Sequence, residues 1–351
     1  MIECSYHRDD TRWDTFVLAH SGGTLFHLSK WRDVLSESFG YQPIYLCAKD
    51  AGRISGVLPL FLVKSLLFGR SLVSMPIGVY GGILAEDAKT ATILLEKAKE
   101  LAKEKRVRYL EIRGNPHSNL PGPPHGSGEV SHWSKKDLYV TFLSAIAPTD
   151  DANLARIPRK QRRMVKQGEK NGLSAIFDNN RLQEFYRIYA ESVRNLGTPV
   201  YGFSYFKNLT ETLGEKCKVL VVEYKGKVVA GVLSFFYKDQ VLPFYGGALK
   251  ESLNLAPNDF MYWELMRYGA VHGFKIFDFG RSKQGTGSFH FKRHWGFEPK
   301  PLPYWYYSCN GRRIPDTSPL NPKLQWAIRL WRTLPLKATM AVGPHIVRHL
   351  P

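Results

Sequence analysis

Residues 276–297 hold the side chains whose types and spacing best suit chemistry. Asp278 lies in an otherwise apolar stretch, Ile276-Phe-Asp-Phe279, and a buried carboxylate is costly without a partner. Arg281 or Lys292 could supply the matching positive charge. The pattern therefore predicts either a buried ion pair that ties a strand to a helix or a carboxylate that accepts a proton.

Lys292 lies between two histidines on a short predicted helix that ends near Gly296, a residue type suited to the left-handed position after a helix. Histidine side chains often act as general bases, so His290 and His294 are candidates for that role. An ammonium group in a partly dry cleft strongly stabilises a developing negative charge. The alternative for Lys292 is an ordinary solvated helix lysine, and the identity of the general base stays open.

Two tyrosines are candidates for binding a substrate through their hydroxyl groups. Tyr245 and Tyr201 could donate a hydrogen bond to the substrate or to a leaving oxygen. Buried tyrosines that bond only to the protein backbone are common, so both interpretations stay open.

The densest charge cluster, residues 156–170, has seven basic residues and one acid. At helical spacing, Arg159, Arg163 and Lys166 share a face, so this helix could present a positive stripe to phosphates. The alternative is a solvated linker helix. The segment has no aromatic residues that could stack on bases, which argues against sequence-specific reading of nucleic acid.

A weak two-copy repeat predicts the elements that must position these residues. Each copy has a hairpin of apolar strands with a glycine turn, then a Tyr-Gly-Gly triplet, a helix and a short strand that ends in an acid. The triplets are Tyr80-Gly-Gly82 and Tyr245-Gly-Gly247, and the acids are Glu111 and Asp278. Residues 297–309 are expected to close the second copy with further strands.

These elements predict an α/β fold class, with mixed sheets of the α+β kind, in two tandem domains. A chain of 351 residues is too long for one ordinary core and suits two. We expect an N-terminal domain over 1–145, a basic linker helix over 146–172, a C-terminal domain over 173–310 and a helical tail over 311–351.

The charge balance favours an anionic partner. The chain has 49 Lys and Arg residues against 31 Asp and Glu residues, a formal net charge of +18. This surplus suits RNA, a nucleotide-linked substrate or an anionic lipid surface, although it also promotes solubility alone. The four cysteines lack metal-ligand spacing, so no metal site and no disulfide is expected.

We expect a cytoplasmic protein, with peripheral contact with the inner membrane as a further option. The N-terminus lacks the basic stretch and apolar run of a signal peptide, and no apolar run approaches the ~20 residues of a membrane span. The tail, residues 323–351, alternates Trp326 and Trp331 with Arg329 and Arg332. It could lie on an anionic membrane surface or pack its tryptophans on the second domain.

An ordered set of motifs, spread over most of the chain, resembles the FemAB group of the GNAT acyltransferase superfamily. Within that group it is similar to the FemAB-like proteins found with exosortase/PEP-CTERM and exopolysaccharide systems. The motifs are His27-Leu-Ser-Lys-Trp31, Tyr80-Gly-Gly82, Thr198-Pro-Val-Tyr201, Tyr245-Gly-Gly247, Asn258-Asp-Phe-Met-Tyr-Trp263, Phe277-Asp-Phe-Gly-Arg-Ser282 and Phe291-Lys-Arg-His-Trp-Gly-Phe297.

This resemblance implies that tandem GNAT-like domains transfer an acyl group to an amine. Better-known members use aminoacyl-tRNA to extend peptidoglycan precursor peptides. Lys292 would then lie where the reacting carbonyl sits and stabilise the oxyanion, with Asp278 as the second catalytic candidate. The residues expected to bind substrate are Trp31, Tyr80, Arg159, Arg163, Lys166, Tyr201, Tyr245 and Arg281.

Two departures from the group bear on the acyl donor, which is left open among aminoacyl-tRNA, acyl-CoA and acyl carrier protein. Some tRNA-using members carry a long antiparallel helical arm in the second domain, and residues 172–307 have no segment of that length or heptad pattern. Acetyltransferases of the superfamily hold the CoA pyrophosphate on a glycine-rich loop at a helix N-terminus. The corresponding stretch, residues 253–259, has no glycine, although Asn258 could cap the helix and help to bind this cofactor.

The expected function is N-acyl or aminoacyl transfer to an amine of a cell-envelope or exopolysaccharide intermediate. The substrate would be an anionic small molecule or a nucleotide- or lipid-linked sugar, with tRNA as a candidate partner. The main alternative is a catalytically degenerate GNAT-like scaffold for exopolysaccharide assembly, which the missing glycine loop favours. A third alternative, an RNA-binding module, depends on the net charge alone.

Overall fold

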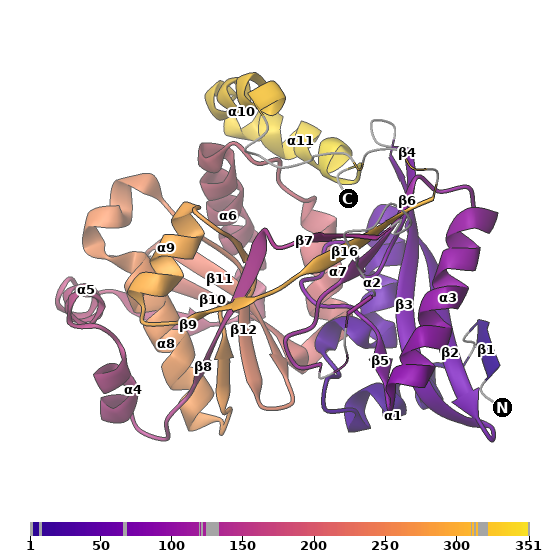
Figure 1. The fold of residues 1–351 in the computed structure, drawn as a ribbon. Coiled ribbons are helices and arrows are strands. Elements are labelled where there is room, and N and C mark those ends of the chain that lie inside the picture. The colour runs from indigo at the N-terminus through magenta and orange to yellow at the C-terminus, as the bar shows by residue number, and fades with distance from the viewer. Residues whose placement is uncertain are drawn as a thin grey trace. The chain divides into compact units, whose positions relative to one another are not determined.

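The computed structural model describes residues 3–6, 9–65, 69–118, 120, 122–123, 133–309, 311, 314 and 322–349. It divides the chain into two compact units. Unit 1 comprises residues 1–140, 301–317 and 348–351, and unit 2 comprises residues 141–300 and 318–347. Each unit is built around an eight-stranded sheet with helices (Figure 1), which is the mixed α/β architecture predicted from the sequence.

Unit 1 has the strand order β1-β2-β3-β4-β6-β16-β7, with β5 paired to β3. Strands β4 and β6 pair in parallel, whereas the β2–β3 hairpin is antiparallel. The strands are β1 (Glu3–Tyr6), β2 (Gln42–Asp50), β3 (Arg53–Ser65), β4 (Gly69–Val73), β5 (Leu84–Ala85), β6 (Tyr109–Arg113), β7 (Trp133–Lys136) and β16 (Tyr304–Ser308). The helices are α1 (Asp10–Ala19), α2 (Ser29–Phe39) and α3 (Ala88–Glu104), with a 3-10 turn η1 (Leu25–His27).

Unit 2 has the strand order β14-β8-β13-β12-β11-β10-β9, with β15 paired to β8. The strands are β8 (Tyr139–Ala145), β9 (Ser174–Phe177), β10 (Cys217–Tyr224), β11 (Lys227–Tyr237), β12 (Gln240–Ala248), β13 (Ile276–Asp278), β14 (Ser282–Lys283) and β15 (Pro299–Pro301). The helices are α4 (Asp150–Arg156), α5 (Arg159–Lys170), α6 (Leu182–Leu196), α7 (Phe203–Leu213), α8 (Pro257–Val271), α9 (Gly287–His294), α10 (Pro322–Thr333) and α11 (Leu336–Val347). Three 3-10 turns complete it: η2 (Asn179–Arg181), η3 (Gly214–Lys216) and η4 (Lys250–Leu255).

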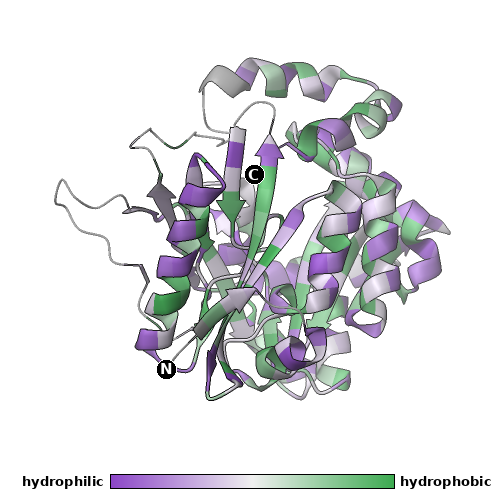
Figure 2. Cartoon of the chain, turned by 90° about the vertical axis from the view of Figure 1, so that its right-hand side faces the viewer, coloured by the Kyte–Doolittle hydropathy of each residue, from purple (hydrophilic) through white to green (hydrophobic). Residues whose placement is uncertain are grey.

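Helix α3 illustrates how sequence pattern and packing agree in unit 1. The Asp87 carboxylate accepts a hydrogen bond from the Thr90 backbone N–H at 2.7 Å, which caps the first turn. Leucine and alanine side chains at helical spacing face the sheet and join its apolar core, whereas the opposite face is charged (Figure 2). Each fully buried leucine contributes roughly 2 kcal/mol to folding. This is the helix that the repeat predicted between the first Tyr-Gly-Gly triplet and Glu111.

The two hairpins share details that the sequence repeat alone did not reveal. Both two-residue turns have positive φ at each residue, Ala51 and Gly52 in β2–β3, and Lys225 and Gly226 in β10–β11. This is the turn geometry that suits the twist of a two-residue hairpin. Both hairpins also carry a register shift two residue pairs from the turn. A shared turn type and a shared bulge strengthen the inference of duplication.

Cross-strand register also tests which residues of the two copies correspond. Residues at the same distance from the two hairpin turns can be traced through their paired residues from strand to strand across each sheet. This tracing ends at Leu110 in unit 1 and at Phe277 in unit 2. The residues that follow are Glu111 and Asp278. The two acids predicted as equivalents therefore occupy the same place in their sheets.

The predicted match of the Tyr-Gly-Gly triplets is wrong by two residues. Gly56 pairs with Ala85, and its counterpart Ala230 pairs with Ala248, so Gly82 rather than Tyr80 corresponds to Tyr245. The physical reason is that β12 is continuous through its triplet, whereas residues 74–83 leave the sheet between β4 and β5.

Each sheet contains one strand that comes from the other half of the chain, and the two exchanged strands occupy the same position in their sheets. In unit 1 the neighbour of β6 is β16, which comes from the C-terminal end of the chain. In unit 2 the neighbour of β13 is β8, which follows the N-terminal half. The expectation that residues 297–309 close the second copy is therefore wrong for β16. It completes the first sheet instead, between β6 and β7.

The tail forms the expected helices, α10 and α11, and both pack on α6 of unit 2 (Figure 1). The sequence left open whether the two tail tryptophans pack on the second domain or face a membrane. Trp331 is 9% exposed and packs inward, whereas Trp326 is 68% exposed. None of the helices formed by the described residues is both long and apolar enough to cross a bilayer. The part of the chain described here also contains no group of three or more His, Cys, Asp or Glu residues that could hold a metal ion.

The strand exchange predicts that a change in β16 weakens the sheet of the N-terminal half. Tyr307 is 5% exposed, and its ring lies 5.3 Å from that of Trp133 on β7. We expect Tyr307→Ala to lower the free energy of unfolding by about 3 kcal/mol through the cavity it creates. Hydrogen exchange should become faster in β6 and β7. Unchanged protection of β6 would contradict the exchange, and Tyr224→Ala, on a partly exposed hairpin, serves as the control.

Candidate functional site

The candidate site lies in unit 2, where β12 and β13 separate. The two strands pair in parallel only at Gln240–Ile276 and Val241–Phe277. β12 then continues to Ala248, bonded to β11 on its other side and bulged at Phe244. Among the described strands, residues 242–248 thus have no strand partner on the β13 side. Tyr262 and Met261 of α8 lie beside Gly246 of this strand, and Lys292 of α9 bonds to the turn that follows β13.

Asp278 ends β13 and is fully buried. Its Oδ1 accepts hydrogen bonds from the Gly280 backbone N–H at 2.8 Å and from the Thr141 hydroxyl at 3.4 Å. Gly280 has a φ of +67°, a conformation that glycine adopts without strain, and this turn aims its N–H at the carboxylate. The turn therefore fixes the orientation of the Asp278 carboxylate independently of any nearby cation.

Lys292 projects from α9 toward the same turn. Its Nζ donates to the backbone oxygens of Gly280 and Arg281, at 3.1 and 3.2 Å. Nζ also lies 5.7 Å from the ring centre of Phe142 and 5.8 Å from that of Phe279. The ammonium group is thus held between two carbonyl groups and two aromatic faces, a setting in which a cation is stabilised without full hydration.

The charges around Lys292 set its protonation. The pKa of Lys292 is lowered from 10.5 to about 7, mainly by burial and to a smaller extent by the positive charge of Arg281. The negative charge of Asp278 acts in the opposite direction and favours the ammonium form. The structure therefore brings together Asp278, Arg281 and Lys292, as the sequence suggested. Near neutral pH, Lys292 can exist as either ammonium or amine.

The corresponding acid in unit 1 has a different partner. Glu111 and Arg113 are each 4% exposed, and the Arg113 Nε donates to Glu111 Oε1 at 2.8 Å. Arg113 also donates to the Gly78 backbone oxygen at 2.6 Å and lies over the ring of Tyr304. In unit 2 the residue at the place of Arg113 is Gly280. Unit 1 therefore neutralises its acid within the strand, whereas unit 2 receives its cation from a helix.

The predicted tyrosines form an aromatic cluster on the hairpin side of unit 2. The hydroxyl groups of Tyr245 and Tyr205 are 2.9 Å apart, and the ring of Tyr201 lies 5.7 Å from that of Tyr245. Burial raises the pKa of Tyr245 well above 10, so its hydroxyl stays protonated. Tyr245 can therefore act only as a hydrogen-bonding group. Tyr201, which is partly exposed, is the more accessible of the predicted pair.

Tyr262 is a site residue that the sequence reasoning missed. It lies on α8, and a Cβ placed on Gly246 of β12 would stand 3.0 Å from its hydroxyl oxygen. Its ring packs 4.8 Å from Phe279 and 5.6 Å from Phe291. Among the described residues its hydroxyl has no hydrogen-bond partner, although burial raises its pKa to about 12 and keeps it protonated. The sequence signals were its place in the motif Asn258-Asp-Phe-Met-Tyr-Trp263 and the room that Gly246 leaves on β12.

The N-terminus of α8 differs from the cap that was predicted. Ala256, with a φ of +61°, is the N-cap, so Asn258 lies inside the first turn and does not cap the helix. Pro257 at the first helical position contributes no N–H. Asp259 adds a buried carboxylate that accepts a hydrogen bond from Trp295 Nε1 at 2.9 Å. A helix end with one N–H missing and an acid in its first turn is a poor site for a pyrophosphate.

The basic helix α5 keeps the charges that the sequence predicted on its surface. Arg159, Arg163 and Lys166 are exposed, and none of them forms an ion pair with a described acid. The start of α5 lies beside the end of α9, because a Cβ on Gly296 would lie 3.0 Å from Pro158. The helix therefore offers uncompensated positive charge next to the element that carries Lys292.

The other predicted residues occupy different surroundings. Trp31 and Tyr80 belong to unit 1, where both are buried and both contact the ring of Phe26. His290 and His294 lie on α9 beside Lys292, and both are exposed. Trp31 and Tyr80 thus contribute to the core of unit 1.

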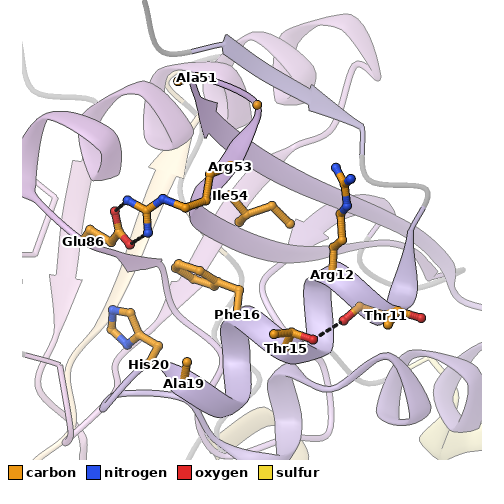
Figure 3. A pocket seen from close by; sticks show the side chains of 11 residues that line it. Thr11, Arg12, Thr15, Phe16, Ala19, His20, Ala51, Arg53, Ile54 and Glu86 are labelled. Atoms are coloured by element: carbon orange, nitrogen blue, oxygen red, sulfur yellow. Dashed lines mark hydrogen bonds and ion pairs between the residues drawn. The ribbon is translucent and has the colours of Figure 1, made fainter.

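One hollow in unit 1 is lined by none of these residues. It has a volume of about 750 Å³ and lies in unit 1 between α1 and the β2–β3 turn, with the Arg53–Glu86 ion pair at its rim (Figure 3). A hollow of about 610 Å³ occupies the matching place in unit 2, between α6 and the β10–β11 turn. Because both copies have it, the shared backbone arrangement explains both hollows. Neither is lined by a predicted site residue.

The burial of Asp259 leads to a prediction about stability. Burial raises its pKa from 3.8 to about 6, so the folded state disfavours the ionised form. The resulting cost is fully present above pH 6 and disappears as the pH falls toward 4. Asp259→Asn, which can still accept from Trp295, should raise the free energy of unfolding by about 1–3 kcal/mol at pH 8 and leave it unchanged near pH 4. Denaturant titrations at both pH values measure this, with exposed Asp151→Asn as the control. A destabilised variant at pH 8 would refute the explanation.

The sequence and the fold of this chain are similar to those of known proteins. The profile described as an acetyltransferase (GNAT) domain matches residues 153–293, which include both Asp278 and Lys292. The lipid II:glycine glycyltransferase of Staphylococcus epidermidis is 22% identical over an alignment that covers 81% of this chain and 87% of that protein. The crystal structure of FemX has a TM-score of 0.67 and 17% identity, and covers 93% of this chain and all of FemX. A tandem GNAT protein from the clavulanic acid biosynthesis pathway has a TM-score of 0.55 and 14% identity, and covers 89% of this chain and all of that one.

These matches agree with the duplicated mixed sheets and with the resemblance drawn from the motifs. The matched domain profile covers most of the unit that contains Lys292, Asp278 and the open edge of β12. The chain is a FemAB-like acyltransferase of the GNAT superfamily, built from two tandem GNAT-like units.

Proposed function

We propose that this acyltransferase transfers an aminoacyl or other acyl group to an amine on a lipid-linked cell-envelope intermediate, of peptidoglycan or of an exopolysaccharide. The observation that carries the proposal is the position of Lys292 in unit 2, half-buried near Asp278 where β12 and β13 separate. The near full-length match to lipid II:glycine glycyltransferases supports the class of acceptor.

In this reaction the acceptor amine attacks the carbonyl carbon of the donor, and the carbonyl oxygen becomes an oxyanion. The bond between the carbonyl carbon and the donor's oxygen or sulfur then breaks, and the leaving group takes up the proton that the amine releases. Lys292, as an ammonium ion, polarises the carbonyl and stabilises the oxyanion. Asp278 acts on Lys292 by favouring its charged form, because its negative charge raises the Lys292 pKa.

The surroundings of the site favour a donor whose phosphates are bound by the side chains of α5 rather than by the N-terminus of α8. The first turn of α8 carries Asp259, whose negative charge opposes an anion there. The exposed cations of α5, Arg159, Arg163 and Lys166, offer an alternative grip for phosphate groups. Aminoacyl-tRNA and acyl carrier protein, with its phosphopantetheine arm, fit this arrangement better than acyl-CoA bound at α8.

The proposal predicts the effect of removing the Lys292 charge. We expect Lys292→Met to lower kcat by about 100- to 1000-fold with little change in KM, because the oxyanion loses its stabilising cation. Transfer of labelled acyl groups from the three donor classes to an amine-bearing lipid-linked acceptor measures this. Lys275→Met, which removes an exposed lysine of unit 2, is the matched control. A Lys292→Met variant with full activity would remove Lys292 from the mechanism, and a wild-type chain inert with all donors would favour a scaffold.

The same experiment has a pH readout that separates two roles for Lys292. Since its pKa is about 7, the ammonium form is lost as the pH rises through 7, and kcat should fall there if the charge is needed. Asp278→Asn should move this fall to lower pH, because it removes the charge that raises the Lys292 pKa. Lys292→Arg stays charged and should lose the fall. A kcat that rises through pH 7 in the wild type would instead identify Lys292 as a base.

The free hydroxyl of Tyr262 predicts a contribution to substrate binding. Tyr262→Phe keeps the ring that packs on Phe279 and should leave the melting temperature unchanged, because no described residue bonds to the hydroxyl. We expect kcat/KM to fall by roughly tenfold, the value of one hydrogen bond to substrate. Tyr268→Phe, on the same helix but stacked on Phe177 and His272, is the control. Equal losses in both variants would argue against a specific contact.

A further inference from the structure

Helices α10 and α11 present an outer face that the fold does not cover. Nine large apolar side chains are more than one-third exposed among the described residues. Three of them, Trp326, Leu330 and Val342, fall in these two short helices, and a fourth, Leu196, lies beside α10. Isolated exposed apolar residues are common on proteins, but this concentration in one segment is not.

The opposite face of the two helices is well packed on the protein. The inner face of the pair is seated on unit 2, where Ile328 lies directly over Gly197 and Gly343 backs onto the Val200 backbone. Arg332 Nη2 also donates to the Leu196 backbone oxygen at 3.1 Å. Trp326 and Leu330 are four residues apart, so they lie on one side of α10, opposite to the face that packs.

The charges on the pair are of one sign. Residues 317–351 contain no Asp or Glu, whereas α10, α11 and the residue that follows carry Lys323, Arg329, Arg332, Lys337 and Arg348. Arg329 and Lys337 are exposed, and neither pairs with an acid in the part of the chain that the structure describes. A tryptophan and a leucine on one side of α10, with exposed and unpaired cations on the same two helices, match the boundary between lipid headgroups and acyl chains.

We propose that the outer face of α10 and α11 docks on the surface of an anionic phospholipid bilayer, with Trp326 and Leu330 inserted at headgroup depth. Arg329 and Lys337 then contact lipid phosphates. The contact is interfacial, because each of the two helices has 12 residues and is too short to span a bilayer. The inference depends on the tail alone and needs no acyl donor or acceptor, so its failure and that of the proposed transfer are distinguishable.

Co-sedimentation of the full chain with lipid vesicles tests the docking. We expect binding to vesicles of phosphatidylglycerol and phosphatidylcholine, little binding to vesicles of phosphatidylcholine alone, and loss of binding as salt is raised. Replacing both Trp326 and Leu330 by serine should lower the affinity by roughly tenfold or more. Arg329→Glu with Lys337→Glu should lower it by a similar factor. Val271→Ser, which removes an 81% exposed apolar side chain on α8, is the matched control and should bind normally.

Three results would overturn the proposal. Equal binding of the wild type to neutral vesicles would exclude the anionic surface as the partner. Unchanged vesicle binding by both tail variants would exclude α10 and α11 as the contact. Loss of binding in Arg159→Glu with Arg163→Glu, but not in the tail variants, would assign the lipid contact to α5. Circular dichroism and melting temperature of each variant confirm that the chain is folded, so a loss of binding reports on the surface.

Discussion

Each of the two sheets contains a strand from the other half of the chain, and this connectivity constrains everything else in the molecule. β16 pairs with β6 in the first sheet, and β8 pairs with β13 in the second. The acid of each copy lies on the strand that receives the exchanged neighbour, so Glu111 faces β16 and Asp278 faces β8. Thr141, which bonds to Asp278, is itself on the exchanged strand. The site therefore forms only when the second sheet has received a strand from outside its own half.

The copies have kept the same framework and diverged in how they balance one buried charge. A buried carboxylate requires a cation or strong hydrogen bonds nearby. Unit 1 meets the requirement with Arg113, two residues along the same strand, and the result is a closed ion pair that also bonds to Gly78. Unit 2 has glycine at that position, and the cation arrives from α9 as Lys292. A lysine on a short helix remains accessible to a reacting group, whereas the arginine in the strand is committed to its neighbours.

The parts of this structure that depend on local sequence could be predicted, and those that depend on pairing between distant segments could not. Turn glycines, helix periodicity and the buried Asp278 are local signals, and they predicted the hairpins, α3, α8 and the acid that meets Lys292. The exchange of β8 and β16 leaves no local trace, because a strand's own residues do not identify its neighbour. Asn258 was misplaced since Ala256 adopts the left-handed backbone that begins α8. Tyr262 escaped notice because an aromatic residue on a helix is usually a core residue.

The exchange also sets an order of events during synthesis. The first half of the chain has β6 by residue 113, but the strand that covers its edge ends only at residue 308. At about 10 residues per second, the ribosome needs roughly 20 seconds to supply it. All eight strands of the second sheet end by residue 301, so that sheet can close before the first. During this interval β6 exposes an unpaired edge, which makes the N-terminal half the part of the nascent protein most in need of a chaperone.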